Sequence, residues 1–365
     1  MRMMPEHLTR PRLTVNLSAI GRNLEALRKL AHGAEVAPVV KADAYGLGDQ
    51  RIAAYLTDEC SVRTLFVATT AEAHALNRQL VDPPLIYILN GYQAADWKGV
   101  ETGRVKPVLN TCTQASSWAK RGGPAAIAVD IGMNRLGLTI DEAQTLPATT
   151  GIDPAQIDLC VMHMSHTGQP DAPQNAAQIA LYSDYVTRLS SVYPEMKFSL
   201  SASGALFLHH DARELLVRPG IAVYGGGADG TPRSTLETVA TLMAPVLAVR
   251  LVRKGDGVGY GARWIAPTDR TIAIVGAGYA DGYHRQLTNR GTVFLGGAEC
   301  PVVGTVSMDL IAVDISDAPT PVSEGAHAEL FGDRIKVDRL AEAADTISYE
   351  LLTSVGNRVE RIYIR

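Results

Sequence analysis

The chain has 365 residues, enough for two domains with well-filled cores, and its net charge is a nearly balanced −4. No block rich in Lys or Arg stands out and no apolar run approaches membrane-spanning length, so neither nucleic acid nor a membrane is an expected partner. The N-terminal residues carry basic side chains without the apolar segment of a secretory signal. Four scattered cysteines form no CxxC pair, which predicts a cytoplasmic protein with no metal site and no disulfide framework.

The first predicted element is a helix. Asn16 or Ser18 is expected to cap it, and Gly33 to end it. Apolar residues recur on one face of this helix, at Ile20, Leu24, Leu27 and Leu30.

After this helix, apolar runs rich in β-branched residues alternate with helical segments. Eight runs are predicted as strands: 35–42, 64–70, 85–90, 106–110, 125–131, 157–164, 197–203 and 215–224. The clearest helical segments between them are 71–80, 113–122 and 175–192. Eight alternating units in about 210 residues predict an α/β fold with an N-terminal (β/α)8 (TIM-like) barrel.

From about Pro232 the runs become short and are separated by Gly, Asp and Pro. They are 238–252, 271–275, 292–295, 300–306, 310–315, 328–331 and 359–364. This pattern predicts a C-terminal, mainly antiparallel β domain. The domains are therefore expected to span 1–232 and 233–365.

Lys41 stands where the first buried strand gives way to a loop that contains Gly46 and Gly48. One interpretation is that its stem packs on the strand end while its ammonium group reaches water. The other is that desolvation lowers its pKa and makes it an imine-forming nucleophile. This stretch by itself favours the first interpretation.

Other reactive side chains follow neighbouring strands. On a (β/α)8 barrel, functional residues gather at the carboxyl ends of the strands. Four residues fall there in addition to Lys41: Arg135, His163, Ser201 and Arg218. Each alone is typical of an ion pair, a core histidine or a turn, but five equivalent positions together indicate a site.

Two segments after the seventh and eighth strands, 201–204 and 218–221, are suited to bind phosphate through backbone N–H groups. A lysine able to form an imine beside a phosphate cradle indicates pyridoxal 5′-phosphate (PLP). Barrel aldolases, however, also combine an imine-forming lysine with phosphate sites.

The chain resembles the alanine racemase family of fold-type III PLP enzymes over nearly its whole length. Five motifs carry the resemblance in order: Val40–Gly48 (VKADAYGLG), Gly132–Gly137 (GMNRLG), Arg218–Gly225 (RPGIAVYG), Val258–Gly261 (VGYG) and Gly278–Gly282 (GYADG).

The resemblance implies a role for each of these residues. Lys41 holds PLP as an imine and is one catalytic base, and Tyr260 is the other, reaching into the partner subunit's barrel in a homodimer with shared active sites. Arg218 contacts the pyridine nitrogen, and His163 links Arg218 to Tyr260. The residues implied to bind the cofactor phosphate are Tyr45, Ser201, Gly220, Ile221 and Tyr349. Those implied to bind the carboxylate of a small amino-acid substrate are Arg135 and the backbone at Met308.

The implied reaction interconverts L- and D-alanine. Two bases on opposite faces of Cα supply its symmetry, because a single base would mostly restore the starting isomer. Free Lys and Tyr have pKa values near 10, so each value must be lowered for catalysis near neutrality. Arg218, always charged and a donor only, leaves the pyridine nitrogen unprotonated, which suppresses transamination.

Three departures from the family pattern leave alternatives open. Ala128 stands where many relatives carry a carbamylated lysine that orients Arg135, the entrance segment 165–170 lacks its usual acidic pair, and Leu200 replaces an asparagine before Ser201. A bound anion or another side chain is therefore expected to position Arg135. Serine or a broader range of substrates, and a PLP-binding relative without turnover, are the alternative functions. A biosynthetic role, supplying D-alanine as a peptidoglycan precursor, and a catabolic role both remain open.

Overall fold

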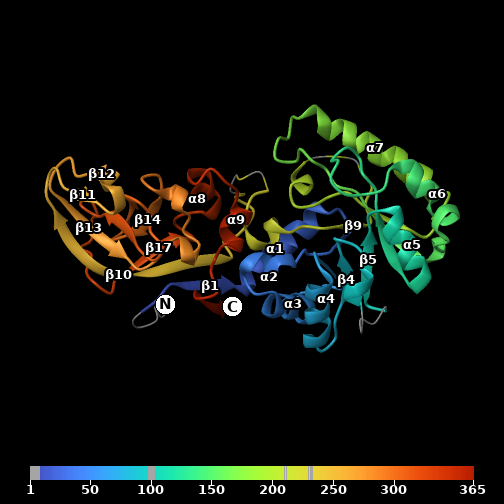
Figure 1. Cartoon of the computed structure of the whole chain (residues 1–365), viewed down its shortest axis with the longest axis horizontal. Helices are drawn as coiled ribbons and strands as arrows, with labels where there is room; N and C mark the ends of the chain where they lie inside the picture. Colours follow the sequence, from blue (N-terminus) through green and yellow to red (C-terminus); the bar gives the residue numbers. More distant parts are fainter. Residues whose placement is uncertain (1–8, 98–102, 209, 211, 229, 231–232) are drawn as a thin grey trace. The chain divides into compact units, whose positions relative to one another are not determined.

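The computed structural model describes residues 9–97, 103–208, 210, 212–228, 230 and 233–365. The chain divides into two compact units, 23–223 and 1–22 with 224–365 (Figure 1). The predicted boundary at 232 lies outside the described residues. The prediction also placed the first 22 residues in the barrel. Of these, the described strand β1 (Arg12–Asn16) instead pairs with two strands of the other unit, β10 (Ala240–Val252) and β18 (Glu360–Ile364).

The unit 23–223 contains the predicted barrel strands. They are β2 (Glu35–Val36), β3 (Thr64–Val67), β4 (Leu85–Ile88), β5 (Val105–Leu109), β6 (Ala125–Ala128), β7 (Ile157–Val161), β8 (Lys197–Ser199) and β9 (Leu216–Val217). β3 to β8 form one parallel sheet in sequence order, and β2 pairs in parallel with β9. Single bridges, Val39 to Phe66 and Ala202 to Arg218, link this pair to both ends of the sheet. The predicted α/β barrel fold is thereby confirmed.

Helices connect these strands. They are α1 (Leu17–Leu30), α2 (Lys41–Gly46), α3 (Asp49–Asp58), α4 (Thr70–Gln79), α5 (Cys112–Arg121), α6 (Ile140–Thr150) and α7 (Pro173–Ser190). Asn16 rather than Ser18 caps α1, because its Oδ1 accepts the backbone N–H of Ala19 at 3.0 Å. The helix ends at Leu30, before Gly33, which adopts a φ of 91°. No helix in the described part of the chain is long and apolar enough to cross a membrane.

The other unit is built on a mainly antiparallel sheet of order β15-β14-β17-β10-β1-β18, to which β13 and β16 add through β10 (Figure 1). The strands not yet given are β11 (Gly257–Val258), β12 (Trp264–Ile265), β13 (Arg270–Val275), β14 (Thr292–Leu295), β15 (Ala298–Pro301), β16 (Ile311–Asp314) and β17 (His327–Phe331). β1 and β18 are the parallel pair in this sheet. Two helices, α8 (Val337–Ala343) and α9 (Ser348–Thr353), were not predicted.

The cap of α1 gives a direct test of the fold. Asn16→Ala removes the acceptor for the Ala19 amide and is expected to lower the free energy of unfolding by about 1 kcal/mol. Ser18→Ala is the control, because Ser18 lies inside the helix, where alanine is favoured. Urea unfolding of both variants measures the difference, and equal losses would contradict the assigned cap.

Candidate functional site

Lys41 begins a left-handed helical turn shortly after the first barrel strand. β2 ends at Val36, earlier than the predicted strand 35–42, and only a single bridge at Val39 continues it. Residues 42–45, none of them glycine, have φ values of 53°, 57°, 50° and 59°. L-residues avoid this conformation because Cβ crowds the following carbonyl, so neighbouring bonds must hold it. Within the segment, the Ala44 amide donates to Val40 O and the Gly48 amide to Asp43 O, each at 2.9 Å.

Three cations gather around one histidine in this unit. The pKa of Lys41 is lowered by burial and by Arg135, while Glu72 opposes the shift. The pKa of His163 falls to about 3 because protein atoms crowd its ring and because Arg218, Arg135 and Lys41 disfavour its protonated form. The structure thus brings together four of the predicted residues. For Lys41 it supports the second interpretation, a desolvated amine.

Arg218 is buried, with 3 % of the residue's surface exposed. Its terminal nitrogens donate to Ser199 Oγ, to Met162 O at 2.7 Å and to Leu200 O at 3.4 Å. All three acceptors are uncharged, and Arg218 forms no ion pair with a described residue. Burial lowers its pKa to about 10, so the group remains a fixed cation near neutrality.

Tyr45, Ser203 and Gly220 form a small polar cradle beside the Lys41 turn. Ser203 Oγ accepts the amides of Gly220 at 2.8 Å and Ala222 at 3.2 Å, which leaves its own proton for another acceptor. A Cβ at Gly220 would lie 2.0 Å from the Tyr45 hydroxyl, so a larger residue there would displace the Tyr45 side chain. Ile221, between the two amides, is fully buried.

Ser201 lies apart from this cradle, which corrects its predicted place. Its hydroxyl donates to Glu214 and lies 3.2 Å from Nε2 of His210. The consecutive amides of Leu200 and Ser201 both donate to Glu214 Oε2, at 2.6 and 2.7 Å. The chain is therefore no longer extended after β8, and it is Ser203 that reaches Gly220. The sequence pattern could have indicated Ser203 as well, because both serines belong to the segment 201–204 that is expected to bind phosphate.

The loop that carries Arg135 is held through its backbone. Asp130 Oδ1 accepts the amides of residues 132–134 at 2.9 to 3.3 Å. The buried amide of Gln178, on α7, donates to Ile131 O at 3.2 Å. The Arg135 side chain is exposed and makes no hydrogen bond or ion pair within the described part of the chain. Asp130 and Gln178 thus order the loop, and the guanidinium remains available to a ligand.

Three predicted residues, Tyr260, Met308 and Tyr349, belong to the unit 1–22 with 224–365. Tyr260 is 77 % exposed on a turn between Gly259 and Gly261, and its carbonyl accepts the Thr305 hydroxyl at 2.8 Å. Met308 is half-exposed, and its amide donates to no described residue. Tyr349 lies on α9 and is partly buried.

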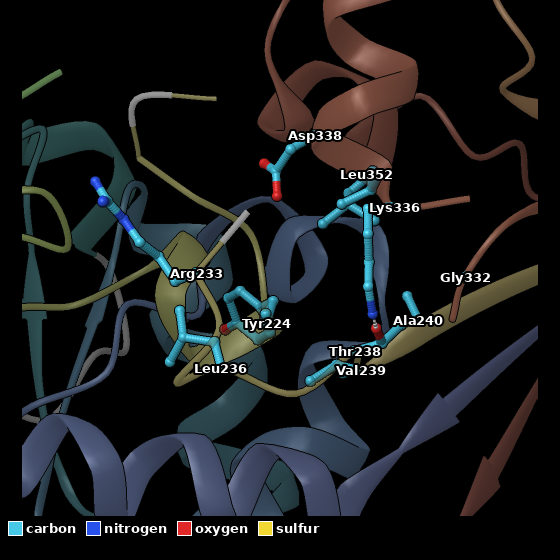
Figure 2. A pocket seen from close by; sticks show the side chains of 12 residues that line it. Tyr224, Arg233, Leu236, Thr238, Val239, Ala240, Gly332, Lys336, Asp338 and Leu352 are labelled. Atoms are coloured by element: carbon cyan, nitrogen blue, oxygen red, sulfur yellow. Dashed lines mark hydrogen bonds between the residues drawn. The ribbon is translucent and has the colours of Figure 1, made fainter. Parts of the chain in front are cut away.

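A separate pocket in the same unit contains none of the predicted residues (Figure 2). Lys336 crosses it and donates from Nζ to the Thr238 hydroxyl at 2.5 Å, while Arg233 points away from its centre. Its volume of about 30 Å³ has room for water but not for a cofactor.

Comparisons with known proteins match nearly the whole chain to one family. The family model described as "Alanine racemase, N-terminal domain" matches residues 15–228, and that described as "Alanine racemase, C-terminal domain" matches 239–363. An alanine racemase of Methylobacterium sp. (strain 4-46) is 39 % identical over 97 % of both chains. A catabolic alanine racemase of Agrobacterium fabrum is 36 % identical over 97 % of this chain and 92 % of that protein. The crystal structure of alanine racemase from Bartonella henselae, with covalently bound pyridoxal phosphate, is similar with a TM-score of 0.88 and 33 % identity over 98 % of this chain and 100 % of that one.

The lowered pKa of His163 predicts acid sensitivity. An unfolded histidine titrates near 6.5, so between about pH 6.5 and 3 the unfolded chain binds a proton that the folded chain does not. This contribution to stability is complete above pH 6.5 and falls with pH, by up to about 1.4 kcal/mol per unit. Urea unfolding of the cofactor-free protein measures this contribution. Between about pH 7 and 5, the free energy of unfolding should fall less in His163→Asn than in the unmodified chain. Parallel pH profiles would contradict the assignment.

Proposed function

The chain belongs to the alanine racemase family, and we propose that Lys41 and Tyr260 are the two bases with which it interconverts L- and D-alanine. The observation that carries the proposal is the group of Lys41, Arg135, His163 and Arg218 at the strand ends. Such a concentration of positive charge suits a ligand with a phosphate and a carboxylate.

The residues of the barrel fit PLP. Tyr45, Ser203 and the backbone of Gly220 and Ile221 would hold its phosphate, with Ser203 in the role first assigned to Ser201. Lys41 would bind its aldehyde carbon through Nζ. We also assign Tyr349 to the phosphate site, on the strength of the family resemblance. When bound, PLP withdraws electrons from the Cα–H bond of an attached amino acid.

Lys41 and Tyr260 move the Cα proton. The lowered pKa of Lys41 increases the fraction of neutral amine available to accept a proton near neutrality. Tyr260 stands on an exposed turn, which supports its entry into the barrel of a partner subunit. We therefore propose a homodimer in which each active site takes one base from each subunit.

The remaining residues set orientation and reaction fidelity. Arg218 would donate to the pyridine nitrogen and leave it unprotonated, because a guanidinium carries no acceptor. His163, neutral at working pH, would lie between Arg218 and the partner's Tyr260. Arg135 and the free amide of Met308 would bind the substrate carboxylate.

A broader substrate range is the second candidate. Ala128 is apolar and the 165–170 segment carries no acidic residue, so the entrance and the support of Arg135 both differ from the family pattern. A panel of L-amino acids separates the candidates: turnover of serine at a rate similar to alanine supports the broader range.

The two-base proposal is tested in heavy water. L-alanine should acquire deuterium at Cα and form D-alanine, as followed by chiral chromatography. Lys41→Ala should abolish the absorbance band of bound PLP together with turnover. Tyr260→Phe should keep the band and slow L-to-D conversion by about 10²- to 10⁴-fold. An unchanged rate would refute the role of Tyr260, and bound PLP with no turnover in the unmodified protein would support a binding protein instead.

The phosphate cradle is tested at Gly220. Gly220→Ala introduces a Cβ within 2.0 Å of the Tyr45 hydroxyl and is expected to weaken PLP binding by at least about tenfold, as measured by absorbance titration. Gly103→Ala is the matched control, because its Cβ would meet no atom within 4 Å. Equal PLP affinity in both variants would contradict the cradle.

A further inference from the structure

Glu72 connects the Lys41 turn to the next strand of the barrel. It lies in the first turn of α4, where it forms a capping box with Thr69. Its Oε2 accepts the amides of Ala68 at 2.8 Å and Thr69 at 2.9 Å, just after β3. Its Oε1 accepts the amide of Ala42 at 2.8 Å, 30 positions earlier in the chain. One carboxylate therefore binds both segments.

The Ala42 amide is the first N–H group after Lys41 and opens the left-handed turn. Glu72 is its acceptor, and a bond from an amide to a carboxylate is about twice as strong as one between neutral groups. A run of four left-handed, non-glycine residues relaxes readily unless such bonds hold it. Release of Ala42 would reorient the adjoining Lys41 peptide and, with it, the amine.

We propose that Glu72 is a positioning residue for Lys41: by holding the Ala42 amide, it keeps the left-handed turn in the conformation that presents the lysine amine to the cofactor site. This inference rests on the proposed function. Glu72 is also the carboxylate that opposes the effects of burial and of Arg135 on Lys41. Asp49, whose pKa is raised to about 6 by burial, Asp43 and Glu72, lies in the same acidic group.

The chain contains a matched control for this role. Glu142 forms the same capping box with Thr139 at the start of α6, and its Oε2 accepts the Thr139 amide at 2.8 Å. It neighbours the Cys112 thiol and accepts no hydrogen bond from the Lys41 turn. Glu142→Gln therefore reproduces the loss of a cap without disturbing Lys41.

Glu72→Gln and Glu142→Gln are compared in the full-length protein. Glu142→Gln should lose the stability of one helix cap, and Glu72→Gln should lose at least as much, because Glu72 also accepts the amides of Ala42 and Ala68. Only Glu72→Gln should speed hydrogen exchange of the Ala42 amide, by about tenfold in the cofactor-free protein, and weaken PLP binding by about tenfold. The pKa of Lys41, read from the pH dependence of its reaction with pyridoxal, should fall further in Glu72→Gln and stay unchanged in Glu142→Gln.

Equal exchange, PLP affinity and Lys41 pKa in the two variants would overturn the proposal and leave Glu72 as a helix cap. If Glu72→Gln does not fold, Glu72→Asp serves in its place, since it keeps the charge but withdraws the carboxylate from Ala42. It should speed Ala42 exchange, and unchanged exchange would likewise overturn the proposal. Failure of the proposed function appears separately, as absence of racemisation in the unmodified protein.

Discussion

The buried guanidinium of Arg218 is the interaction on which the functional end of the barrel depends. Arg218 follows β9, and its three acceptors lie where β7 and β8 end. One side chain therefore joins the ends of three strands. Every hydrogen-bond acceptor is neutral, and the Glu214 carboxylate stabilises the positive charge without a hydrogen bond to it. A buried cation with no directly bonded carboxylate costs free energy in the folded state, and an anionic ligand would offset that cost.

The cations at the strand ends, together with burial, shift the pKa values of the neighbouring groups. Burial is the first cause of both pKa shifts. Arg218, Arg135 and Lys41 add to it in keeping His163 neutral, and Arg135 adds to it in lowering the pKa of Lys41. Glu72 is the carboxylate that opposes the lowering of the Lys41 pKa. Its oxygens accept hydrogen bonds from three backbone amides, and it forms no ion pair within the described part of the chain. The proposed anion binding and base activation would thus both depend on the cations at the strand ends.

The proposed bases belong to structural units of different character. Lys41 lies in the barrel unit, in a turn that is held by hydrogen bonds to backbone carbonyls and to the Glu72 carboxylate. Tyr260 stands on an exposed glycine-flanked turn of the β unit. An exposed base suits a site completed by a second subunit, because association would remove the tyrosine from water and place it beside the cations of the barrel.

The sequence by itself determined the barrel, the β sheet and the strand ends that carry Lys41, Arg135, His163 and Arg218, because alternation and hydrophobic runs are local patterns. Only the tertiary structure decided that β1 joins the C-terminal sheet, since strand pairing depends on distant partners. It also replaced Ser201 by Ser203 in the cradle and revealed the contact between Glu72 and Ala42. The direction in which a side chain points after a strand ends follows from the backbone geometry, which residue types do not specify. The same holds for a hydrogen bond between groups 30 residues apart.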